Sequence, residues 1–496
     1  MPLPESTCAP PAVKFLLNDQ PVVVADAPPT LTLLNYLRVQ AGLCGTKEGC
    51  AEGDCGACTV VLAELTDDGQ RIRYQAINSC IRFLPTVDGK AVITTEALAA
   101  RDGTLHPAQQ ALVDHHGSQC GFCTPGFVMS LFALYQSCQS TDRAAVLSTL
   151  SGNLCRCTGY RPILDAATHL FDYPQPPHWG HADAQSPQRL AALEAITRTT
   201  TLTGASYAAP TDLEELAALR VTNPEARLLA GGTDIGLWVT KLMRDIGPLI
   251  YLGNVAELKR IELTDQHLSI GAAVTLSDAW PAILIHYPQL AVQADRFASV
   301  PIRNSATLCG NLANGSPIGD TLPAMLALDA RLQLRCGAVT RVLALNDFYL
   351  GYQQNALAPG EFVAAVQIPL PCPDEYIASY KLSKRYDQDI SAVCATFRVR
   401  LTAGRVSLVH LAYGGLAATA KRARCAEAAL QQQPWTQASI IKACDALAED
   451  FQPLSDLRAS SAYRLQAASN LLQRFFLQNT GIQTDLHLQP TDLEAR

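Results

Sequence analysis

Residues 49–58 read Gly-Cys-Ala-Glu-Gly-Asp-Cys-Gly-Ala-Cys, and this stretch decides how the first part of the chain folds. Its thiols Cys50, Cys55 and Cys58 stand in the order C-x4-C-x2-C, and Cys80 follows downstream. That spacing is typical of a loop that wraps a [2Fe–2S] cluster and receives its fourth thiolate from a separate strand. The three glycines of the stretch allow the backbone conformations that such a loop requires.

Two other interpretations explain this stretch less well. A structural zinc site more often shows two C-x2-C pairs, and this loop has one. A disulfide framework requires an oxidising compartment, and nothing in the sequence indicates export. Cys44 lies just outside the spacing pattern, so we expect no ligand role for it.

A second set of thiols lies in two glycine-containing stretches. Residues 119–126 read Gln-Cys-Gly-Phe-Cys-Thr-Pro-Gly, and residues 152–162 read Gly-Asn-Leu-Cys-Arg-Cys-Thr-Gly-Tyr-Arg-Pro. Four thiolates in two connections predict a second [2Fe–2S] cluster. The cysteines are Cys120, Cys123, Cys155 and Cys157.

The first of these stretches also resembles a C-x-x-C redox pair. Such a dithiol lies at a helix N-terminus, where the helix dipole lowers the pKa of the thiol. It should follow a buried strand, whereas a helical pattern precedes Cys120. The C-x-C pair of Cys155 and Cys157 would also remain unexplained, so we favour the cluster.

The N-terminal region predicts a small α+β domain of the ferredoxin kind. Two β-rich runs over 13–24 flank an Asn-Asp turn signal and predict a hairpin. Thr30 is expected to cap a helix over 31–40, which has leucines on one side. Strands are expected over 59–63 and 71–77.

Further along, the sequence predicts four helices with the two cysteine pairs in their connections. Pro107 suits the first turn of the first helix, which should end near His115. An apolar helix is expected over 127–135, Thr141 is expected to cap a third helix, and the last should end near Phe171. These helices predict a bundle that holds the second metal site.

A linker is expected after the bundle. Residues 173–200 are rich in Pro, His, Asp and Arg and show no steady period. A short helix around 189–196 fits this composition. A new globular region is expected to begin near Ser206.

Composition and charge narrow the functional classes. The net charge of −7 argues against a nucleic-acid binding site, because such a site needs a basic face. No apolar run reaches the roughly 18 to 20 residues of a membrane span. Met1–Pro11 lacks the pattern of a secretory signal, so the expected location is the cytoplasm. Eleven of the 17 cysteines lie at or before Cys157, which places the metal chemistry in the N-terminal third.

A strand, a glycine turn and a helix in succession suggest a phosphate site. We expect a strand over 227–230, a Gly-Gly-Thr-Asp turn over 231–234, and a helix over 235–243 that Thr233 or Asp234 caps. This arrangement presents backbone N–H groups to a phosphate. Gly-Gly turns are also common without a ligand, and no G-x-G-x-x-G occurs to support a Rossmann site.

A second stretch strengthens the prediction of a nucleotide cofactor. Residues 299–320 are rich in Gly, Asn and Ser, and we expect a long ordered loop, which is usually functional. Asp320 has the chemistry to accept a hydrogen bond from a ribose hydroxyl, and Gly310 and Asn311 to approach a pyrophosphate. The alternative is a solvated surface loop.

The last part of the chain gives a weaker signal. Alternating strands are expected over 380–409, then a helix over 417–431 and further helices. The charged stretch 384–390 interrupts the strand pattern. It fits either a cofactor-facing corner or a salt-bridged surface turn.

With both cysteine sets and both glycine stretches in view, the chain resembles the molybdenum hydroxylases, the xanthine oxidase family, over nearly its whole length. The resemblance implies an α+β multidomain fold. Its parts are a β-grasp ferredoxin-like domain (1–90), a four-helix iron–sulfur bundle (91–172), a linker (173–200), an α+β FAD-binding domain of the vanillyl-alcohol-oxidase/PCMH-like type (201–372) and a C-terminal α+β flavoprotein subdomain (373–496).

The resemblance also implies a role for the chain. It would be an electron-transfer subunit that receives electrons from a molybdopterin-bearing large subunit. The electrons would pass through the bundle cluster, the loop cluster and FAD to NAD during oxidation of hypoxanthine and xanthine to urate. A heterotetramer of two small and two large subunits is the expected assembly. Other members act on aldehydes, nicotinate, aromatic CoA esters or carbon monoxide, and a metal-assembly scaffold is a further alternative.

By motif match, the resemblance implies a set of flavin contacts and no general acid or base. Leu228 to Ile235 would line the pyrophosphate, and 387–390 would lie near the flavin ring and the nicotinamide. Cys309 departs from the pattern, because we expect a glycine there. The implied contacts are Leu228, Leu229, Ala230, Gly231, Gly232, Thr233, Asp234, Ile235, Phe297, Thr307, Leu308, Cys309, Gly310, Asn311, Asp320, Val363 and Lys381.

Overall fold

The chain forms two compact units in the computed structural model, which describes residues 12–176, 178–482 and 484. The first consists of Met1–Ala256 and Ala298–Ala306, and the second of Glu257–Phe297 and Thr307–Arg496. No described helix combines the length and apolar character that crossing a bilayer demands. The first eleven residues, in which no secretory signal is expected, lie outside the described residues.

The first unit begins with a five-stranded sheet in the order β2-β1-β5-β3-β4. The predicted hairpin is confirmed, since β1 and β2 pair antiparallel and Asn18 and Asp19 adopt positive φ in the turn. Thr32, not Thr30, caps the following helix, because its hydroxyl accepts the N–H of Asn35. The elements are β1 (Ala12–Leu17), β2 (Gln20–Ala25), α1 (Leu33–Asn35), a π-helical turn (Tyr36–Gln40), β3 (Thr59–Leu65), β4 (Ile72–Asn78) and β5 (Ala91–Ile93).

Four helices follow, as predicted. The predicted cap at Thr141 is wrong, because the Asp142 carboxylate accepts the N–H of Ala145 and begins the third helix. The sequence offered two adjacent cap residues, and only the backbone geometry decides between them. The helices are α2 (Pro107–Asp114), α3 (Thr124–Ser137), α4 (Arg143–Leu150) and α5 (Arg161–Thr168).

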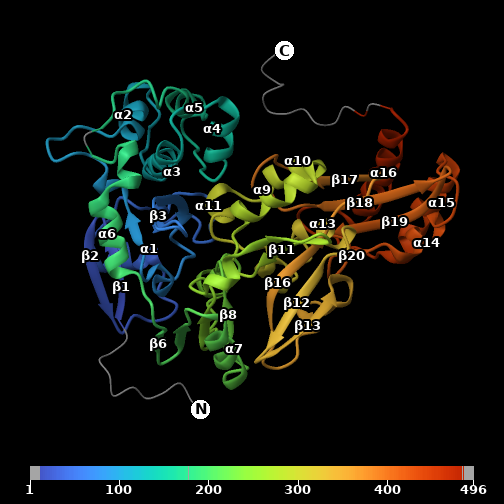
Figure 1. Ribbon diagram of the computed structural model, residues 1–496. Helices are drawn as coiled ribbons and strands as arrows, with labels where there is room; N and C mark the ends of the chain where they lie inside the picture. Colours follow the sequence, from blue (N-terminus) through green and yellow to red (C-terminus); the bar gives the residue numbers. More distant parts are fainter. Residues whose placement is uncertain (1–11, 177, 483, 485–496) are drawn as a thin grey trace. The chain divides into compact units, whose positions relative to one another are not determined.

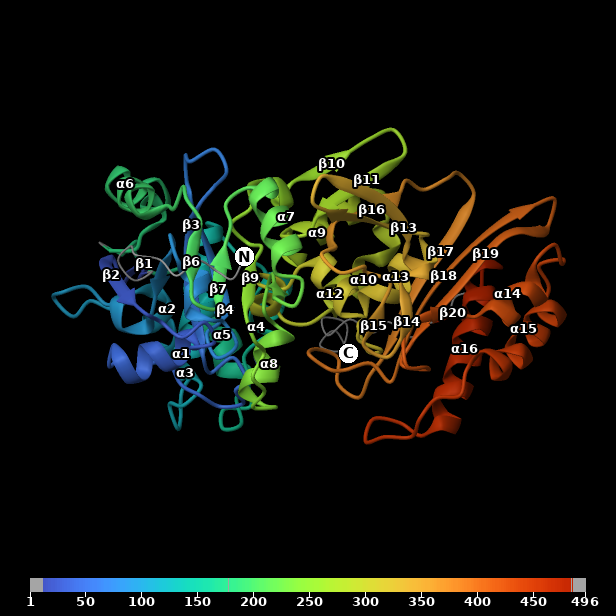
Figure 2. The ribbon, with the colours of Figure 1, turned by 90° about the horizontal axis from the view of Figure 1, so that it is seen from below.

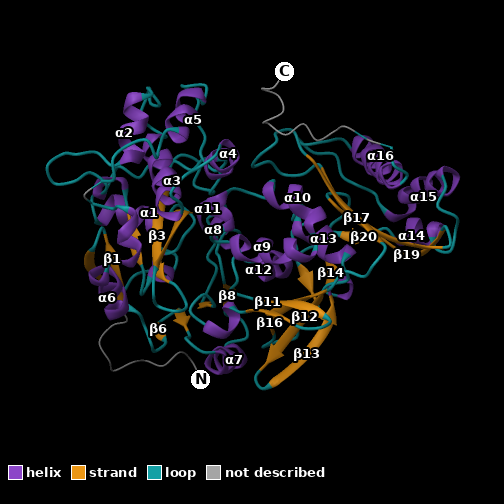
Figure 3. Ribbon diagram, turned by 45° about the horizontal axis from the view of Figure 1, so that its top comes forward, coloured by secondary structure: helices purple, strands orange, loops and turns teal. Residues whose placement is uncertain are grey.

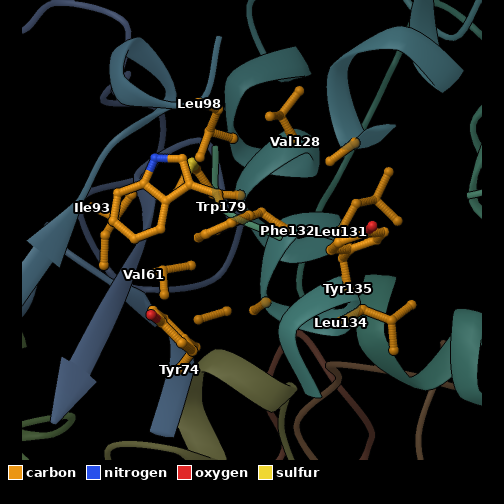
Figure 4. Close-up of a cluster of buried hydrophobic side chains, with 14 of the residues drawn as sticks. Val61, Tyr74, Ile93, Leu98, Val128, Leu131, Phe132, Leu134, Tyr135 and Trp179 are labelled. Atoms are coloured by element: carbon orange, nitrogen blue, oxygen red, sulfur yellow. The ribbon is translucent and has the colours of Figure 1, made fainter. Parts of the chain in front are cut away.

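The segment expected to be a plain linker contributes to the core. Trp179 is 1% exposed, and its ring lies edge-on to Phe132 of α3 and Tyr74 of β4. Figure 4 shows this ring among side chains of the first sheet and of α3. The indole N–H donates to the carbonyl of Ala97. The predicted short helix is present as α6 (Pro187–Ile196), and its Arg189 guanidinium stacks 3.6 Å from the Trp179 ring.

The first unit ends with a small sheet in the order β6-β7-β9-β8. The predicted strand, turn and helix are present, although the helix ends at Thr240 rather than near Met243. In Figure 1 the ribbon of this part is green, and β6, α7 and β8 are labelled. The elements are β6 (Leu202–Gly204), β7 (Tyr207–Ala209), α7 (Leu213–Thr222), β8 (Arg227–Leu229), α8 (Ile235–Thr240) and β9 (Leu249–Tyr251), with α11 (Val300–Arg303) returning to this unit.

The second unit is built on a sheet in the order β10-β11-β16-β12-β13 (Figure 3). The stretch expected to be a long loop contains helices α11 and α12; Thr307 caps α12, and Gly315 ends it in the left-handed conformation. The elements are β10 (Ile261–Leu263), β11 (His267–Gly271), α9 (Leu276–His286), α10 (Ala291–Asp295), α12 (Leu308–Asn314), α13 (Thr321–Ala327), β12 (Arg331–Cys336), β13 (Val339–Ala344), β14 (Tyr349–Gly351), β15 (Gln354–Asn355) and β16 (Phe362–Pro369).

A second sheet of this unit has the order β17-β18-β19-β20, and helices α14 to α16 lie along it (Figure 2). The helix expected over 417–431 begins only at Arg424, after the short strand β20. The elements are β17 (Glu375–Leu382), β18 (Val393–Thr402), β19 (Arg405–Gly414), β20 (Lys421–Arg422), α14 (Arg424–Leu430), α15 (Gln437–Asp450) and α16 (Ser461–Asn479).

Candidate cofactor sites

The loop thiols predicted as ligands meet at the end of the first sheet. The sulfurs of Cys58 and Cys80 are 3.3 Å apart and both residues are buried. Cys58 ends the loop just before β3, and Cys80 follows β4, so the pairing of these two strands brings the thiols together. The side-chain amide of Asn78 donates to the Cys58 sulfur at 3.7 Å.

The Cys50 sulfur accepts hydrogen bonds from three backbone N–H groups. The backbone N–H groups of Glu52, Asp54 and Cys55 donate to it at 3.4, 3.3 and 3.3 Å. Hydrogen bonds from the Cys55 and Cys80 thiols hold the pKa of Cys50 well below its ordinary value. All four loop thiols are therefore in contact. The three N–H groups stabilise negative charge on the Cys50 sulfur, and the thiolate is the form that binds iron.

The bundle thiols meet in two pairs, each with one member from each connection. Cys157 shares a hydrogen bond with Cys120, and Cys155 shares one with Cys123. Burial, followed by the Cys155 contact, raises the pKa of Cys123 to about 12. The segment before α3 is helix α2 and a turn, not a strand, so the dithiol interpretation lacks its structural context.

Polar groups support Cys155 within the bundle. The Thr158 hydroxyl lies 3.2 Å from the Cys155 sulfur, and the backbone N–H of Cys155 donates to the Tyr160 hydroxyl at 3.0 Å. Tyr160 itself has φ +69, which is unusual for a residue with a side chain. Cys120 and Cys157 are exposed, so this side of the bundle opens to the surface of the unit.

The chemistry of the donor set suits an iron–sulfur cluster, because every member of each set is a thiol. Each set brings four thiols together, which is the number of thiolates that a [2Fe–2S] cluster requires. The residues present therefore fit a [2Fe–2S] cluster at each thiol set.

Sequence reasoning missed the contact that joins the two thiol sets. The N–H of Leu154 donates to the carbonyl of Cys55 at 3.0 Å, and the Asn153 amide donates to the carbonyl of Gly56 at 3.1 Å. A Cβ on Gly56 would lie 2.1 Å from the carbonyl oxygen of Gly152. A Cβ on Gly126 would lie 2.2 Å from the carbonyl oxygen of Gly56. In the sequence, the glycines next to the cysteine pairs could have indicated that these backbones pack closely together.

Eight described cysteines lie outside both thiol sets. Cys44 is exposed, and its thiol lies 3.8 Å from the carbonyl oxygen of Arg38. Cys138 donates to the carbonyl of Leu134 at the end of α3. Cys309 is described below with the predicted flavin residues.

In the first unit, the predicted pyrophosphate segment forms β8, a tight turn and the start of α8. A Cβ on Gly231 would lie 1.9 Å from the carbonyl oxygen of Ser305, and Gly232 has φ +76, so both positions require glycine. Asp234 begins α8 without a side-chain cap. This carboxylate therefore does not cap the first N–H groups of the helix. A bound phosphate would be able to accept hydrogen bonds from these groups.

In the second unit, α12 presents the other predicted segment. The N–H of Gly310 donates to the Thr307 hydroxyl at 3.0 Å, and a Cβ on Gly310 would lie 2.7 Å from that oxygen. Cys309 is buried and its thiol donates to the carbonyl of Ile270 in β11. Burial raises its pKa to about 12. Since this thiol faces the sheet, it does not disturb the surface that Gly310 and Asn311 form.

Asp320 and Lys381, predicted as flavin contacts, form a buried ion pair at 2.7 Å. The Ser391 hydroxyl donates to Asp320 at 2.6 Å, and Lys381 also donates to the carbonyl of Arg296 at 3.0 Å. The adjacent Phe297 lies beside Trp280. Val363 is likewise buried, in β16 opposite Leu334 of β12.

The charged stretch 384–390 forms an exposed turn between β17 and β18. Arg385 and Asp389 pair at 3.6 Å, and the Asp389 carboxylate accepts the N–H of Arg385 at 2.8 Å. The Arg296 guanidinium stacks on Tyr386 and donates to its carbonyl. These contacts support the salt-bridged turn, and a nicotinamide contact there stays a prediction.

Comparison with known proteins adds independent support for the cofactor sites. Four family models match successive parts of the chain. They are the 2Fe-2S iron-sulfur cluster binding domain (residues 15–84), the [2Fe-2S] binding domain (94–168), the FAD binding domain in molybdopterin dehydrogenase (200–371) and the CO dehydrogenase flavoprotein C-terminal domain (378–479). The predicted α+β multidomain fold is confirmed.

Relatives with different names match most of the chain. A xanthine dehydrogenase of Emericella nidulans is 33% identical over 94% of this chain and 38% of its own length. An aldehyde oxidase 2 of Cavia porcellus is 30% identical over 94% of this chain and 39% of its own length. The chain thus spans less than two-fifths of either relative.

Solved structures resemble about half of the chain. A carbon monoxide dehydrogenase from Hydrogenophaga pseudoflava has a TM-score of 0.51 and 28% identity, covering 54% of this chain and 94% of that one. A quinoline 2-oxidoreductase from Pseudomonas putida 86 has a TM-score of 0.50 and 28% identity, covering 56% and 98%. The chain therefore carries two [2Fe–2S] domains together with an FAD-binding domain.

Proposed function

We propose that the chain, which carries two [2Fe–2S] domains and an FAD-binding domain, is the electron-transfer subunit of a molybdenum hydroxylase and carries electrons from a molybdopterin-bearing partner subunit to NAD. The observation that supports this most directly is the contact between the two thiol sets. Leu154, next to Cys155, donates to the carbonyl of Cys55, so a ligand of one proposed cluster is hydrogen-bonded to the neighbour of a ligand of the other.

The proposed ligands are the two thiol sets already described. The bound clusters and flavin would supply the electron-transfer chemistry, and the protein would supply position and tuning. The N–H groups around Cys50 and the Thr158 hydroxyl beside Cys155 would stabilise thiolate charge. The exposed thiols Cys120 and Cys157 place the bundle set nearest the surface, where a partner subunit can deliver electrons.

For FAD, Leu228 to Ile235 are proposed to hold the pyrophosphate through backbone N–H groups. Thr307 to Asn311 are proposed to line the cofactor where Gly310 lacks a side chain. Asp320 and Lys381 are proposed to act as one buried pair, in which the ammonium holds the carboxylate in position to accept a hydroxyl. Phe297 and Val363 complete the proposed contacts.

The proposed substrates are hypoxanthine and xanthine, oxidised on the partner subunit to urate. Relatives named xanthine dehydrogenase support this choice. The relative named aldehyde oxidase 2 and the structural neighbour named quinoline 2-oxidoreductase support the alternative, the same electron-transfer role with an aldehyde or another N-heterocycle as substrate. The proposed assembly is a heterotetramer of two chains of each kind.

Anaerobic absorbance of the chain, purified with its native partner, tests the proposal. We expect xanthine to bleach the flavin and iron–sulfur bands and NAD to restore them. An aldehyde and quinoline serve as matched substrates in parallel samples. Bleaching by one of these but not by xanthine would reassign the substrate, and failure of NAD to restore the bands would reject NAD as the acceptor.

A further inference from the structure

The structure points to a tuning role for the C-terminal end of α8. We propose that Thr240 and Lys241 position the Cys50 loop, and that the Lys241 ammonium raises the reduction potential of the cluster held there. This inference rests on the proposed function, because it takes the loop thiols as cluster ligands. It adds to that function a residue that is not itself a ligand.

Two direct bonds tie α8 to the loop. The Thr240 hydroxyl donates to the carbonyl of Ala51 at 2.7 Å, and the Lys241 ammonium donates to the carbonyl of Cys50 at 3.0 Å. Ala51 has φ +56, a left-handed conformation that costs free energy for a residue with a Cβ. Bonds on both sides of this strained peptide hold the loop in the conformation that directs three N–H groups at the Cys50 sulfur.

The same helix also packs against the turn after β4, which carries the fourth thiol. A Cβ on Gly236 would lie 2.7 Å from the carbonyl oxygen of Ile81, so the helix and this turn approach closely only because this residue is glycine. Leu237 packs against the small buried cluster that includes Cys58, Cys80 and Ile81. Helix α8 is thus fixed against the thiol set from two directions.

The charges around this contact have opposite expected effects. Lys241 pairs with Glu52 at 3.4 Å, and both side chains are partly exposed, at 43% and 38%. Reduction adds one negative charge to a cluster, so a nearby cation favours the reduced form and a nearby anion disfavours it. Lys241 should therefore raise the potential, and Glu52 should lower it. Partial exposure makes both effects modest and salt-dependent.

An EPR-monitored redox titration of the complete enzyme tests the inference, with the bundle cluster as an internal reference. In Lys241→Gln we expect the equilibrium constant for reducing the loop cluster to fall about three- to tenfold, where tenfold is ~59 mV for one electron. In Glu52→Gln it should rise, and in Lys241→Arg it should stay near wild type. The potential of the bundle cluster should not move in any variant, and high salt should shrink the shifts.

The outcomes separate this inference from the function it rests on. Unchanged loop potentials, or shifts of the same sign in Lys241→Gln and Glu52→Gln, would overturn the inference and leave the clusters in place. Equal shifts of both clusters would also overturn it, because they would indicate a general loosening of the fold. Absence of two [2Fe–2S] signals from the wild-type enzyme would instead overturn the proposed function, and the inference with it.

Discussion

The position of His106 in the bundle favours the neutral form of its imidazole ring. The side chain is fully buried, its Nδ1 accepts the N–H of Ala108 at 3.1 Å, and its Nε2 lies 3.3 Å from the carbonyl of Trp179. Both contacts are favourable only for a neutral ring that carries its proton on Nε2. Burial lowers the pKa of His106 to about 4.

This shift predicts a loss of stability in acid. Because the folded pKa lies below the ordinary value, the unfolded state binds the proton more readily, and stability falls as the pH drops from about 6.5 to about 4. The total loss should be about 3 kcal/mol. Hydrogen-exchange protection of α2 between pH 7 and pH 4.5 measures it. His106→Asn should flatten this dependence and the exposed-site variant His116→Asn should not; equal slopes in all three proteins would contradict the assignment.

The buried pair of Asp320 and Lys381 gives a second prediction for a single side chain. Lys381→Met leaves the Asp320 carboxylate buried without its cation, so the free energy of unfolding should fall by about 3–5 kcal/mol. FAD retention should fall with it if the proposed contacts are correct. Denaturant unfolding and flavin content measure the two effects. Lys442→Met removes an exposed cation from the same unit and should change neither, so similar losses in both variants would contradict the prediction.

Among the elements, the loop of residues 49–58 depends most on one glycine. Gly56 has φ +68, and a Cβ there would lie 2.1 Å from the carbonyl oxygen of Gly152. Gly69 provides a matched position, because it has φ +66 and nothing within 4 Å of its Cβ site. The two glycines therefore separate the cost of backbone conformation from the cost of the contact between loop and bundle.

Gly69→Ala should destabilise the protein by about 1–2 kcal/mol, the cost of a left-handed alanine. Gly56→Ala should cost more, because the loop must also move away from the bundle, and the iron content should fall. Thermal unfolding and iron analysis of both variants measure the difference. Equal destabilisation with full iron content in both would show that the loop and the bundle tolerate separation at Gly56.

The sequence predicts an element well when the residues that determine the element are adjacent in the chain. The first hairpin was predicted because its turn residues and strand runs are adjacent. The caps at Thr32 and Asp142 were missed because neighbouring residues offered the same side-chain chemistry. The stretch 299–320 was expected to be a loop because Gly, Asn and Ser disfavour helix, whereas the Thr307 cap and the packing of buried Leu308 and Leu312 override that propensity.

For the whole molecule, the thiol sets were predictable but their connection was not. Ligand spacing is a property of the sequence, so the spacing alone identifies Cys50, Cys55, Cys58 and Cys80 as candidate ligands. The role of Asn153 depends on how a loop and a bundle far apart in sequence pack together. The same holds for Thr240 and Lys241, whose partners lie almost two hundred residues earlier in the chain.

Serine substitutions test whether the two thiol sets act in one path. Cys50→Ser and Cys155→Ser should each remove one cluster, lower the iron content by about half and abolish NADH formation from the partner's substrate, because a hydroxyl is a poor replacement for a thiolate on iron. Cys44→Ser, an exposed thiol outside both sets, should retain both clusters and full activity. Iron analysis, EPR and NADH absorbance provide the measurements. NADH formation that persists in either ligand variant would mean that electrons bypass that cluster, and the serial path through both thiol sets would be wrong.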